Sequence, residues 1–158
     1  MKQFKSYRQG DVAIARIDAL PADLKKSALE HGKVILAHGE VTGHAHGFAA
    51  TEAEKFTDAN GREFFNITGR PLKFTLPLVR RWKNQVMVKH PKLGVIEFNE
   101  TDVEVQGDQV KVRGAFGLLR HDEHHAHGIP AGAYKGDGRN GTVQQREYSP
   151  EEIRNVAD

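Results

Sequence analysis

The sequence predicts a mainly β protein, a single-domain barrel or sandwich with two or three short helices. Apolar and polar residues alternate with a period of two in several short stretches, and turn residues recur between these stretches. Helical patterns are confined to brief segments, which argues against a parallel α/β sheet. The chain has 158 residues, so we expect one domain spanning residues 1–158 with its own core.

The first forty residues contain two predicted strands and one predicted helix. Apolar residues alternate along residues 11–18, as in a half-buried strand. Residues 21–30 begin with proline, are rich in helix formers and are followed by Gly32, so they predict a short helix. Residues 33–37 are apolar and predict a buried strand.

The middle of the chain contains one clear hairpin and one ambiguous stretch. Asn60-Gly61 lies between the apolar stretches of residues 56–67, a pattern typical of a type I′ hairpin. Residues 78–82 follow a proline and are compatible with the start of a helix, whereas residues 85–89 look extended.

A second hairpin is the clearest β signal in the sequence. Valines alternate along residues 103–112 on both sides of a Gly-Asp pair at 107–108. The glycine-rich residues 135–141 predict a turn between a strand near 133–134 and a strand over 142–148.

The last predicted element is a short helix over residues 151–157. Ser149 fits the N-cap, Pro150 the first helical position and Glu152 the partner in a capping box. Together with residues 21–30, this segment accounts for the helices expected in an otherwise β-rich chain.

Composition excludes several classes of site. The absence of cysteine excludes disulfides, thiolate zinc sites, iron–sulfur clusters and cysteine nucleophiles, so imidazole, carboxylate or carbonyl groups must hold any metal. The basic N-terminus is not followed by an apolar segment, and no apolar run approaches the roughly 20 residues that span a bilayer. We therefore expect a cytoplasmic protein without membrane contact. A net charge of +2 does not by itself indicate nucleic-acid binding.

The histidines are the strongest functional signal. Six of the nine lie in two short windows, at residues 44–46 and 121–127. His44 and His46 are two residues apart between glycines, so on an extended backbone both rings project from one face and can bind the same ion.

The second window allows two geometries. As a strand it places His121, Glu123, His125 and His127 on one face. As a helical turn it brings His121 next to His124 and His125. Either geometry presents at least two imidazole nitrogens beside carboxylates, a donor set that suits zinc, iron or manganese and not calcium or magnesium.

These windows predict a divalent transition-metal site, with zinc favoured over iron or manganese. The expected ligands are His44, His46, His121, His124 and His125. The expected reaction is metal-dependent hydrolysis, with Glu123 as the catalytic base that accepts the proton of a water.

Several alternatives remain open at this point. One is a non-catalytic metal-binding module, or one that contacts nucleic acid through residues 80–83, where cations surround a tryptophan. Others are dioxygen chemistry at a two-histidine, one-carboxylate iron site, and a solvent-exposed histidine loop that only senses pH. The substrate, either a small molecule or a nucleic acid, and the formation of a homo-oligomer are left open.

Four motifs resemble a group of small uncharacterised bacterial and phage proteins. They are Gln9-Gly10-Asp11-Val12, residues 39–46 (GEVTGHAH), His121-x-Glu123-His124 and residues 145–150 (QREYSP). The resemblance favours His44, His46, His121 and His124 as a shared set and implies no reaction. A looser resemblance links the His-x-His and the Pro130-x-Gly132 turn to the cupins, small double-stranded β-helix metal proteins. Cupins place a glutamate sooner after His-x-His than Glu52 lies here, and here the second cluster precedes the turn.

Overall fold

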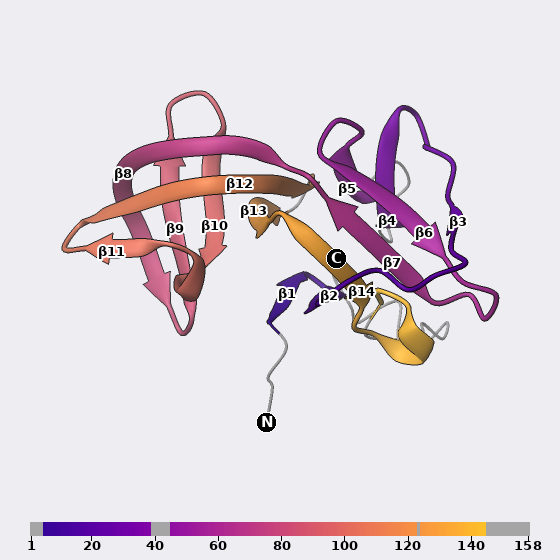
Figure 1. The fold of residues 1–158 in the computed structure, drawn as a ribbon. Coiled ribbons are helices and arrows are strands. Elements are labelled where there is room, and N and C mark those ends of the chain that lie inside the picture. The colour runs from indigo at the N-terminus through magenta and orange to yellow at the C-terminus, as the bar shows by residue number, and fades with distance from the viewer. Residues whose placement is uncertain (1–4, 39–44, 123, 145–158) are drawn as a thin grey trace, which may run out of the picture.

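The structure, a computed structural model, describes residues 5–38, 45–122 and 124–144. The prediction of a mainly β protein is confirmed, because strands account for nearly all regular structure in these ranges (Figure 1). The helices in these ranges are two single-turn 3₁₀ helices, η1 (Glu100–Asp102) and η2 (Arg139–Gly141). No helix in the described ranges has the length and apolar character needed to cross a bilayer.

One part of the fold is a six-stranded antiparallel sheet with the order β1-β2-β14-β7-β6-β3. Its strands are β1 (Ser6–Gln9), β2 (Val12–Ile17), β3 (Lys25–Lys26), β6 (Ala53–Thr57), β7 (Glu63–Ile67) and β14 (Gly132–Gly136). β1 and β2 form a hairpin in which Gln9 pairs with Val12, so Gly10 and Asp11 are the two turn residues. This turn contributes to the candidate site described below.

The other part is a closed five-stranded barrel (Figure 1). Its strands are β8 (Arg70–Trp82), β9 (Gln85–His90), β10 (Gly94–Asn99), β12 (Gln109–His121) and β13 (His124–Pro130). Neighbouring strands are antiparallel except for β10 and β13, which run parallel and close the ring. A short strand, β11 (Glu104–Gln106), pairs with β12 outside the ring.

A third hairpin connects to the end of the barrel. Its strands, β4 (Lys33–His38) and β5 (Ala45–Ala49), pair with each other, and Gly47 of β5 pairs with Arg120 near the end of β12. The long strand β12 therefore pairs with β8 in the barrel and ends beside β5. Its last residue, His121, lies at this junction.

Each part has its own apolar core. The barrel is filled by Leu72, Val86, Val88, Ile96, Phe98, Val110, Val112, Phe116 and Leu118. The second core lies between the six-stranded sheet and the β4–β5 hairpin and includes Tyr7, Val12, Ile14, Val34, Leu36, Phe48, Phe65, Ile67, Leu119 and Tyr134. β12 contributes Leu118 to the first core and Leu119 to the second, as expected where a strand has apolar groups on both faces.

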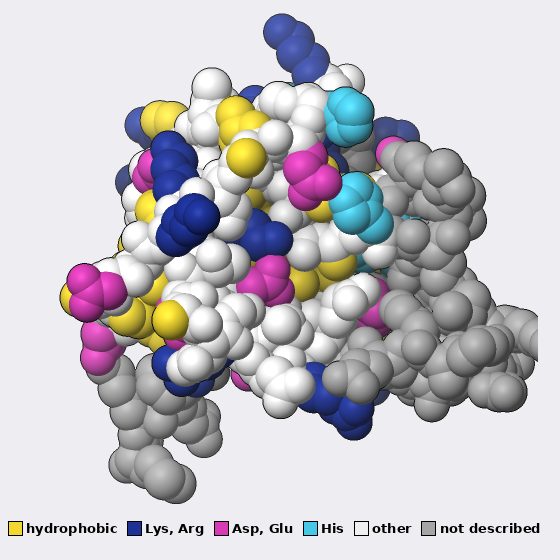
Figure 2. Space-filling model, turned by 90° about the vertical axis from the view of Figure 1, so that its right-hand side faces the viewer, with side chains coloured by type: hydrophobic (Ala, Val, Ile, Leu, Met, Phe, Trp, Pro, Cys, Tyr) yellow, Lys and Arg dark blue, Asp and Glu magenta, His cyan; other side chains and the backbone are white. Residues whose placement is uncertain are grey.

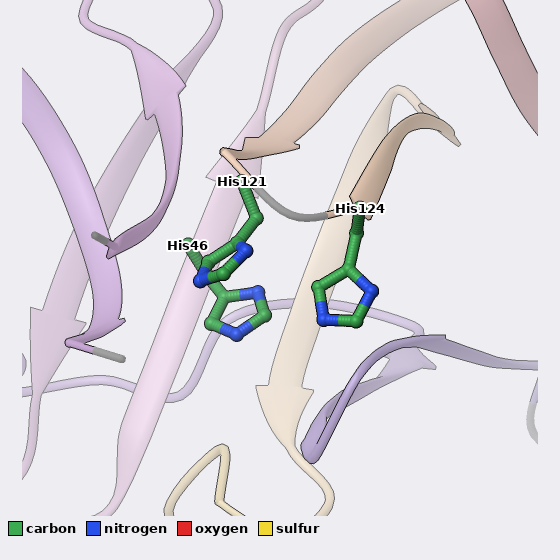
Figure 3. A group of neighbouring side chains, drawn as sticks. All are labelled: His46, His121 and His124. Atoms are coloured by element: carbon green, nitrogen blue, oxygen red, sulfur yellow. The ribbon is translucent and has the colours of Figure 1, made fainter. Parts of the chain in front are cut away.

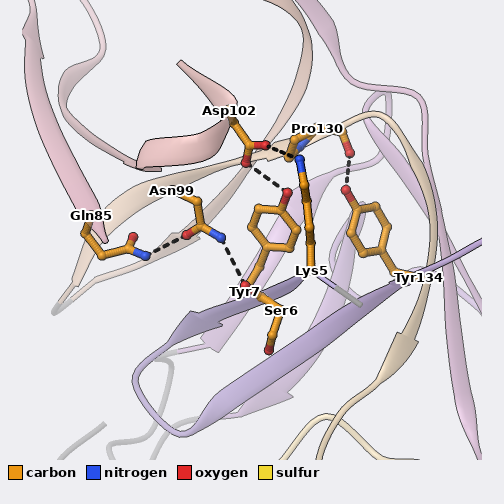
Figure 4. A network of polar contacts seen from close by, with 8 residues as sticks. All are labelled: Lys5, Ser6, Tyr7, Gln85, Asn99, Asp102, Pro130 and Tyr134. Atoms are coloured by element: carbon orange, nitrogen blue, oxygen red, sulfur yellow. Dashed lines mark hydrogen bonds and ion pairs between the residues drawn. The ribbon is translucent and has the colours of Figure 1, made fainter. Parts of the chain in front are cut away.

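The polar contacts between β1 and the barrel fix the position of the β1–β2 turn (Figure 4). Tyr7 donates its hydroxyl hydrogen to the Asp102 carboxylate at 2.8 Å, and Lys5 approaches the same carboxylate at 3.4 Å. Asn99 of β10 donates to the backbone carbonyl of Ser6 at 3.0 Å. Burial, strengthened by the Asp102 charge, holds the pKa of Tyr7 well above its usual value, so this hydroxyl remains a donor.

The helix predicted over residues 21–30 is wrong. Lys25 and Lys26 form β3 and pair with Thr57 and Phe56 of β6, and the amide of Ser27 donates to the carbonyl of Lys55. Tertiary pairing with the edge of the sheet therefore outweighs the helix propensity of this segment.

The hairpin around Asn60-Gly61 is confirmed, but its type I′ turn is wrong. Thr57 pairs with Glu63, which leaves a five-residue loop, and only Gly61 of the two expected residues has positive φ (79°). The Asp58 carboxylate accepts the amide hydrogens of Asn60 and Arg62, both at 2.9 Å. This side chain stabilises a longer loop than the dipeptide signal implies.

The other predicted elements have mixed outcomes. The strands over residues 11–18, 33–37 and 133–134 and the hairpin over residues 103–112 are confirmed. Residues 78–82 continue β8 rather than starting a helix, and residues 85–89 are extended in β9 as expected. Of the strand predicted over residues 142–148, residues 142–144 form only an isolated bridge, between Gln144 and Val12, and the rest lies outside the described residues. The predicted helix over residues 151–157 also lies outside them.

Candidate metal centre

Three histidines from three strands meet at the junction of the barrel with the β4–β5 hairpin (Figure 3). His46 lies on β5, His121 ends β12 and His124 begins β13. His121 and His124 are opposite each other in the antiparallel β12–β13 pair, with a register shift between Leu119 and His121. Opposed residues of such a pair have neighbouring side chains, which explains why these two rings meet.

The three rings lie close enough to act as a group. One nitrogen from each lies within 4.8 Å of the other two. The rings of His46 and His121 are stacked with centroids 4.2 Å apart, and His124 lies 4.9 Å from His121 and 5.8 Å from His46. Nitrogens that share a tetrahedral zinc ion are roughly 3.4 Å apart. The planes of the His46 and His121 rings are nearly parallel, so the rings would have to rotate for their in-plane lone pairs to converge on one ion.

The candidate coordinating nitrogens of the cluster are shielded from water. His46 is fully buried and His121 nearly so, and the Nε2 atoms of all three rings are inaccessible to solvent. The Nε2 of His124 has no hydrogen-bond partner among the described residues. A buried nitrogen without a partner is destabilising in the isolated protein, and coordination of a cation would satisfy it.

Gln9 fixes the tautomer of His46. Its side-chain Nε2 donates to the carbonyl oxygens of Leu119 and His125, at 2.8 and 2.9 Å. Both amide hydrogens are thus used, so the Gln9 Oε1, 2.9 Å from the Nδ1 of His46, must accept a hydrogen from that ring. The Nε2 of His46 then keeps its lone pair for a metal, which is the outer-sphere arrangement typical of histidine ligands.

Gly10 provides the space for the imidazoles. It has φ of 59°, as expected for the first turn position of a type II′ hairpin. A Cβ atom at this position would lie 2.9 Å from the Nε2 of His124 and 3.3 Å from the Cε1 of His46. Glycine is therefore required by the backbone conformation and by the two rings beside it.

Asp11 is the described carboxylate closest to the His46 lone pair. Its Oδ1 lies 4.0 Å from the Nε2 of His46, and the Asp11 side chain is largely buried. In the neutral tautomer that Gln9 selects, Nε2 is unprotonated, so this pair is then not an ion pair. Two ligands of one tetrahedral ion are roughly 3.4 Å apart, so Asp11 lies beside the three-histidine group rather than within it.

The structure thus assembles part of the predicted ligand set. His46, His121 and His124 come together, whereas His125 is exposed on β13 and is not in the group. His44 and the expected base Glu123 lie outside the described residues. The window around residue 121 is neither one strand nor a helical turn, because it contains the end of β12 and the start of β13.

Several residues of the site were missed as functional candidates in the sequence. Gln9, Gly10 and Asp11 were visible only as part of a shared motif, and their contacts with His46 and His124 depend on the packing of β1 and β2 against β13. Glu97 of β10 is a further carboxylate in this region. Burial raises the pKa of its carboxyl group, while the neighbouring His125 and His124 act in the opposite direction.

His127 is buried near the cluster but does not belong to it. Its Nε2 has no hydrogen-bond partner among the described residues, and its ring packs edge-on against Tyr7 at 6.1 Å. Burial lowers the pKa of His127 from 6.5 to about 4, so the ring is neutral near pH 7.

The fold and the cluster define a cysteine-free, all-β protein with a candidate three-histidine metal centre. Residues 8–100 match a family described as a domain of unknown function (DUF8820). The match covers more than half of the chain, so the chain belongs to this family, and the expectation of an uncharacterised family is confirmed. No curated protein and no solved structure matches the chain. The matched region includes Gln9, Gly10 and His46 and ends before β12 and β13.

Proposed function

We propose that the protein is a metal-dependent enzyme of hydrolytic type whose ion is held by His46, His121 and His124. The observation that carries this proposal is the convergence of three imidazoles, two of them buried, and the orientation of one of the two by Gln9. Imidazole donors favour zinc, with iron and manganese as alternatives. Three protein ligands leave a coordination position for water, as in catalytic rather than structural zinc sites.

The chemistry of such a site needs a proton acceptor beside the ion. A divalent ion supplies a Lewis acid that lowers the pKa of water to near neutrality. Asp11 lies beside the cluster, and Glu123 is the base expected from the sequence. Either carboxylate would take a proton from the water as its oxygen attacks the substrate, and return that proton to the leaving group.

Metal titration tests the ligand set. Chelator-stripped protein made without a histidine tag is titrated with Zn²⁺ in a calorimeter, and one equivalent is expected to bind. His46→Ala, His121→Ala and His124→Ala should each abolish stoichiometric binding. His125→Ala, an exposed neighbour on the same strand, is the matched control and should bind as the parent does. Gln9→Ala should weaken binding by roughly 10- to 100-fold, because it removes the acceptor that orients His46.

The same preparations separate ligation from catalysis. Unchanged stoichiometry in both His121→Ala and His124→Ala would overturn the metal site. Zinc-, manganese- and iron-loaded protein is then assayed with chromogenic carboxylate and phosphate esters, and hydrolysis should disappear with chelator and return with metal. Tight metal binding with no hydrolysis by any loaded form would instead favour a non-catalytic metal-binding module.

We propose contact with single-stranded nucleic acid as a second candidate function, based on the tip of the β8–β9 hairpin. Trp82 is 59% exposed there. The Arg80 guanidinium lies 5.5 Å from its ring centroid, and the Lys83 ammonium 6.0 Å. An aromatic face flanked by cations binds stacked bases and phosphates with little sequence preference.

Tryptophan fluorescence tests this second function directly, because Trp82 is the one tryptophan in the chain. A single-stranded oligothymidylate should quench the emission at low salt, and added salt should reverse the quenching. Arg80→Ala should weaken the effect, since it removes the guanidinium that lies over the ring. Emission that does not respond to the oligonucleotide at low salt would refute this function.

A further inference from the structure

A cavity of about 920 Å³ opens beside the histidine cluster. His121 and His124 line it, so two of the three proposed ligands face this space. Its volume lies within the range of small-molecule sites, roughly 300–1,000 Å³. The third proposed ligand, His46, is fully buried and does not line the cavity.

The β4–β5 hairpin forms one wall, and its sequence explains why the space is open. Ala45, Gly47 and Ala49 alternate along β5 on the cavity side, while His46 and Phe48 alternate with them in the buried core. A Cβ atom at Gly47 would lie 2.9 Å from the carbonyl oxygen of Val34, so only glycine fits there. Small side chains on this face leave the volume that larger ones would fill.

Apolar side chains form much of the remaining lining. They are Ile35 on the hairpin side and Leu93 and Val95 on the barrel side. An apolar wall of this kind favours a ligand with a hydrocarbon body over a fully polar one, because burial removes apolar surface from water.

Two cations line the cavity, Arg120 and Lys33. Their side chains make no hydrogen bond or ion pair with other described residues. Glu30, by contrast, is engaged by His38, whose Nε2 lies 2.9 Å from its carboxylate. Figure 2 shows histidine and acidic side chains side by side on one face of the molecule. A lone guanidinium beside an apolar wall is suited to a carboxylate or phosphate, which it can bind through two parallel hydrogen bonds.

We propose that this cavity binds a small organic anion, a carboxylate or phosphate with an apolar body, whose charged group is held by Arg120. The inference rests on the proposed function for its placement beside His121 and His124, and it names the substrate class of that site. Arg120 lines the same cavity as His121 and His124. An anionic group held by Arg120 would therefore lie in the space that two of the proposed ligands line, and Lys33 adds a second positive charge at the hairpin wall.

The test uses metal-free protein, so that binding to the cavity is measured without the ion. The probes are octanoate, octyl phosphate and octylamine. Their binding is measured by saturation-transfer NMR and by calorimetry. At least one of the two anions should bind, and octylamine should not. Binding of one anion alone supports the proposal and identifies the charged group that Arg120 prefers.

Two variants locate the binding site. Arg120→Gln should lower the affinity for the anion by about tenfold or more, since it removes a charged hydrogen-bond donor. Arg113→Gln, on an exposed part of the same strand, is the matched control and should bind as the parent does. Ala49→Leu should also weaken binding by filling the space above β5. Anions that bind no better than octylamine, or that bind Arg120→Gln as they bind the parent, would overturn the proposal.

The zinc titration keeps the two proposals distinguishable. Arg120→Gln should still bind one equivalent of zinc, because Arg120 is not a ligand. Protein that binds octanoate through Arg120 but binds no zinc would retain the anion site and refute the metal function. Protein that binds one equivalent of zinc but neither anion would retain the metal site and refute the anion site.

Discussion

Replacing Glu52 by alanine is expected to lower the free energy of unfolding by about 3 kcal/mol. Glu52 is 3% exposed, and its carboxylate accepts the amide hydrogen of Leu118 in β12 at 2.7 Å. The other carboxylate oxygen pairs with Arg70 of β8 at 3.0 Å. Alanine would leave the buried amide of Leu118 without an acceptor. This loss contributes more than the loss of the ion pair, because the Arg70 side chain is 40% exposed and water can solvate its guanidinium.

Urea denaturation measures the effect of this substitution. Glu54→Ala is the matched control, because the ion pair of Glu54 with Lys26 lies at the surface and should contribute less than about 1 kcal/mol. The loss of stability in Glu52→Gln should lie between the losses in Glu52→Ala and Glu54→Ala, since the glutamine amide oxygen can still accept the Leu118 hydrogen. A Glu52→Ala variant as stable as Glu54→Ala would show that the contact between the sheet and the barrel has no such role.

Acid is expected to destabilise the protein through His127 by about 2 kcal/mol at pH 5, approaching about 3 kcal/mol near pH 4. Burial lowers the pKa of His127 from 6.5 to about 4. Below pH 6.5 the unfolded chain binds a proton that the folded chain does not, so stability falls as the pH falls. The contribution is fully present above pH 6.5 and is lost progressively down to the folded-state pKa.

Urea titrations of metal-free protein at pH 7.5 and pH 5 test this dependence. His127→Leu should remove that part of the acid sensitivity, so its two unfolding free energies should differ by about 2 kcal/mol less than those of the parent. His125→Leu, at an exposed position of the same strand, should leave the parent difference unchanged. Equal acid sensitivity in His127→Leu and the parent would contradict the buried neutral state of this ring.

The elements that could be predicted from sequence are those whose pairing is local. Alternating valines around Gly107-Asp108 fix a hairpin with neighbours in sequence, and the structure pairs Gln106 with Gln109 as expected. Residues 21–30 were predicted as a helix from their helix formers. The prediction failed because β3 pairs with β6, and the local pattern does not reveal that partner. The Asn60-Gly61 loop differs for a similar reason, since the Asp58 carboxylate determines its geometry.

Prediction of the candidate site had the same limits. Histidine spacing identified His46, His121 and His124, because residue type and clustering are visible in sequence. Their convergence depends on the register shift in the β12–β13 pair and on the long-range pairing of β5 with β12, neither of which the spacing of the histidines reveals. The role of Gln9 depends on a contact across 37 positions of the chain, from β1 to β5.

The parallel pairing of β10 with β13 has a consequence for folding kinetics. Antiparallel hairpins such as β8–β9 and β11–β12 form from nearby residues, whereas Ile96 must find Ala126 after the intervening strands are in place. The loop-closure entropy of that step disfavours the β10–β13 pairing until the other strands have formed. His121 and His124 meet within the local β12–β13 pair, whereas His46 reaches them only when β5 pairs with β12. An ion bound by all three rings would therefore oppose the separation of β5 from β12, and amide hydrogens of this pairing should exchange faster in the apoprotein than in the metal-bound protein.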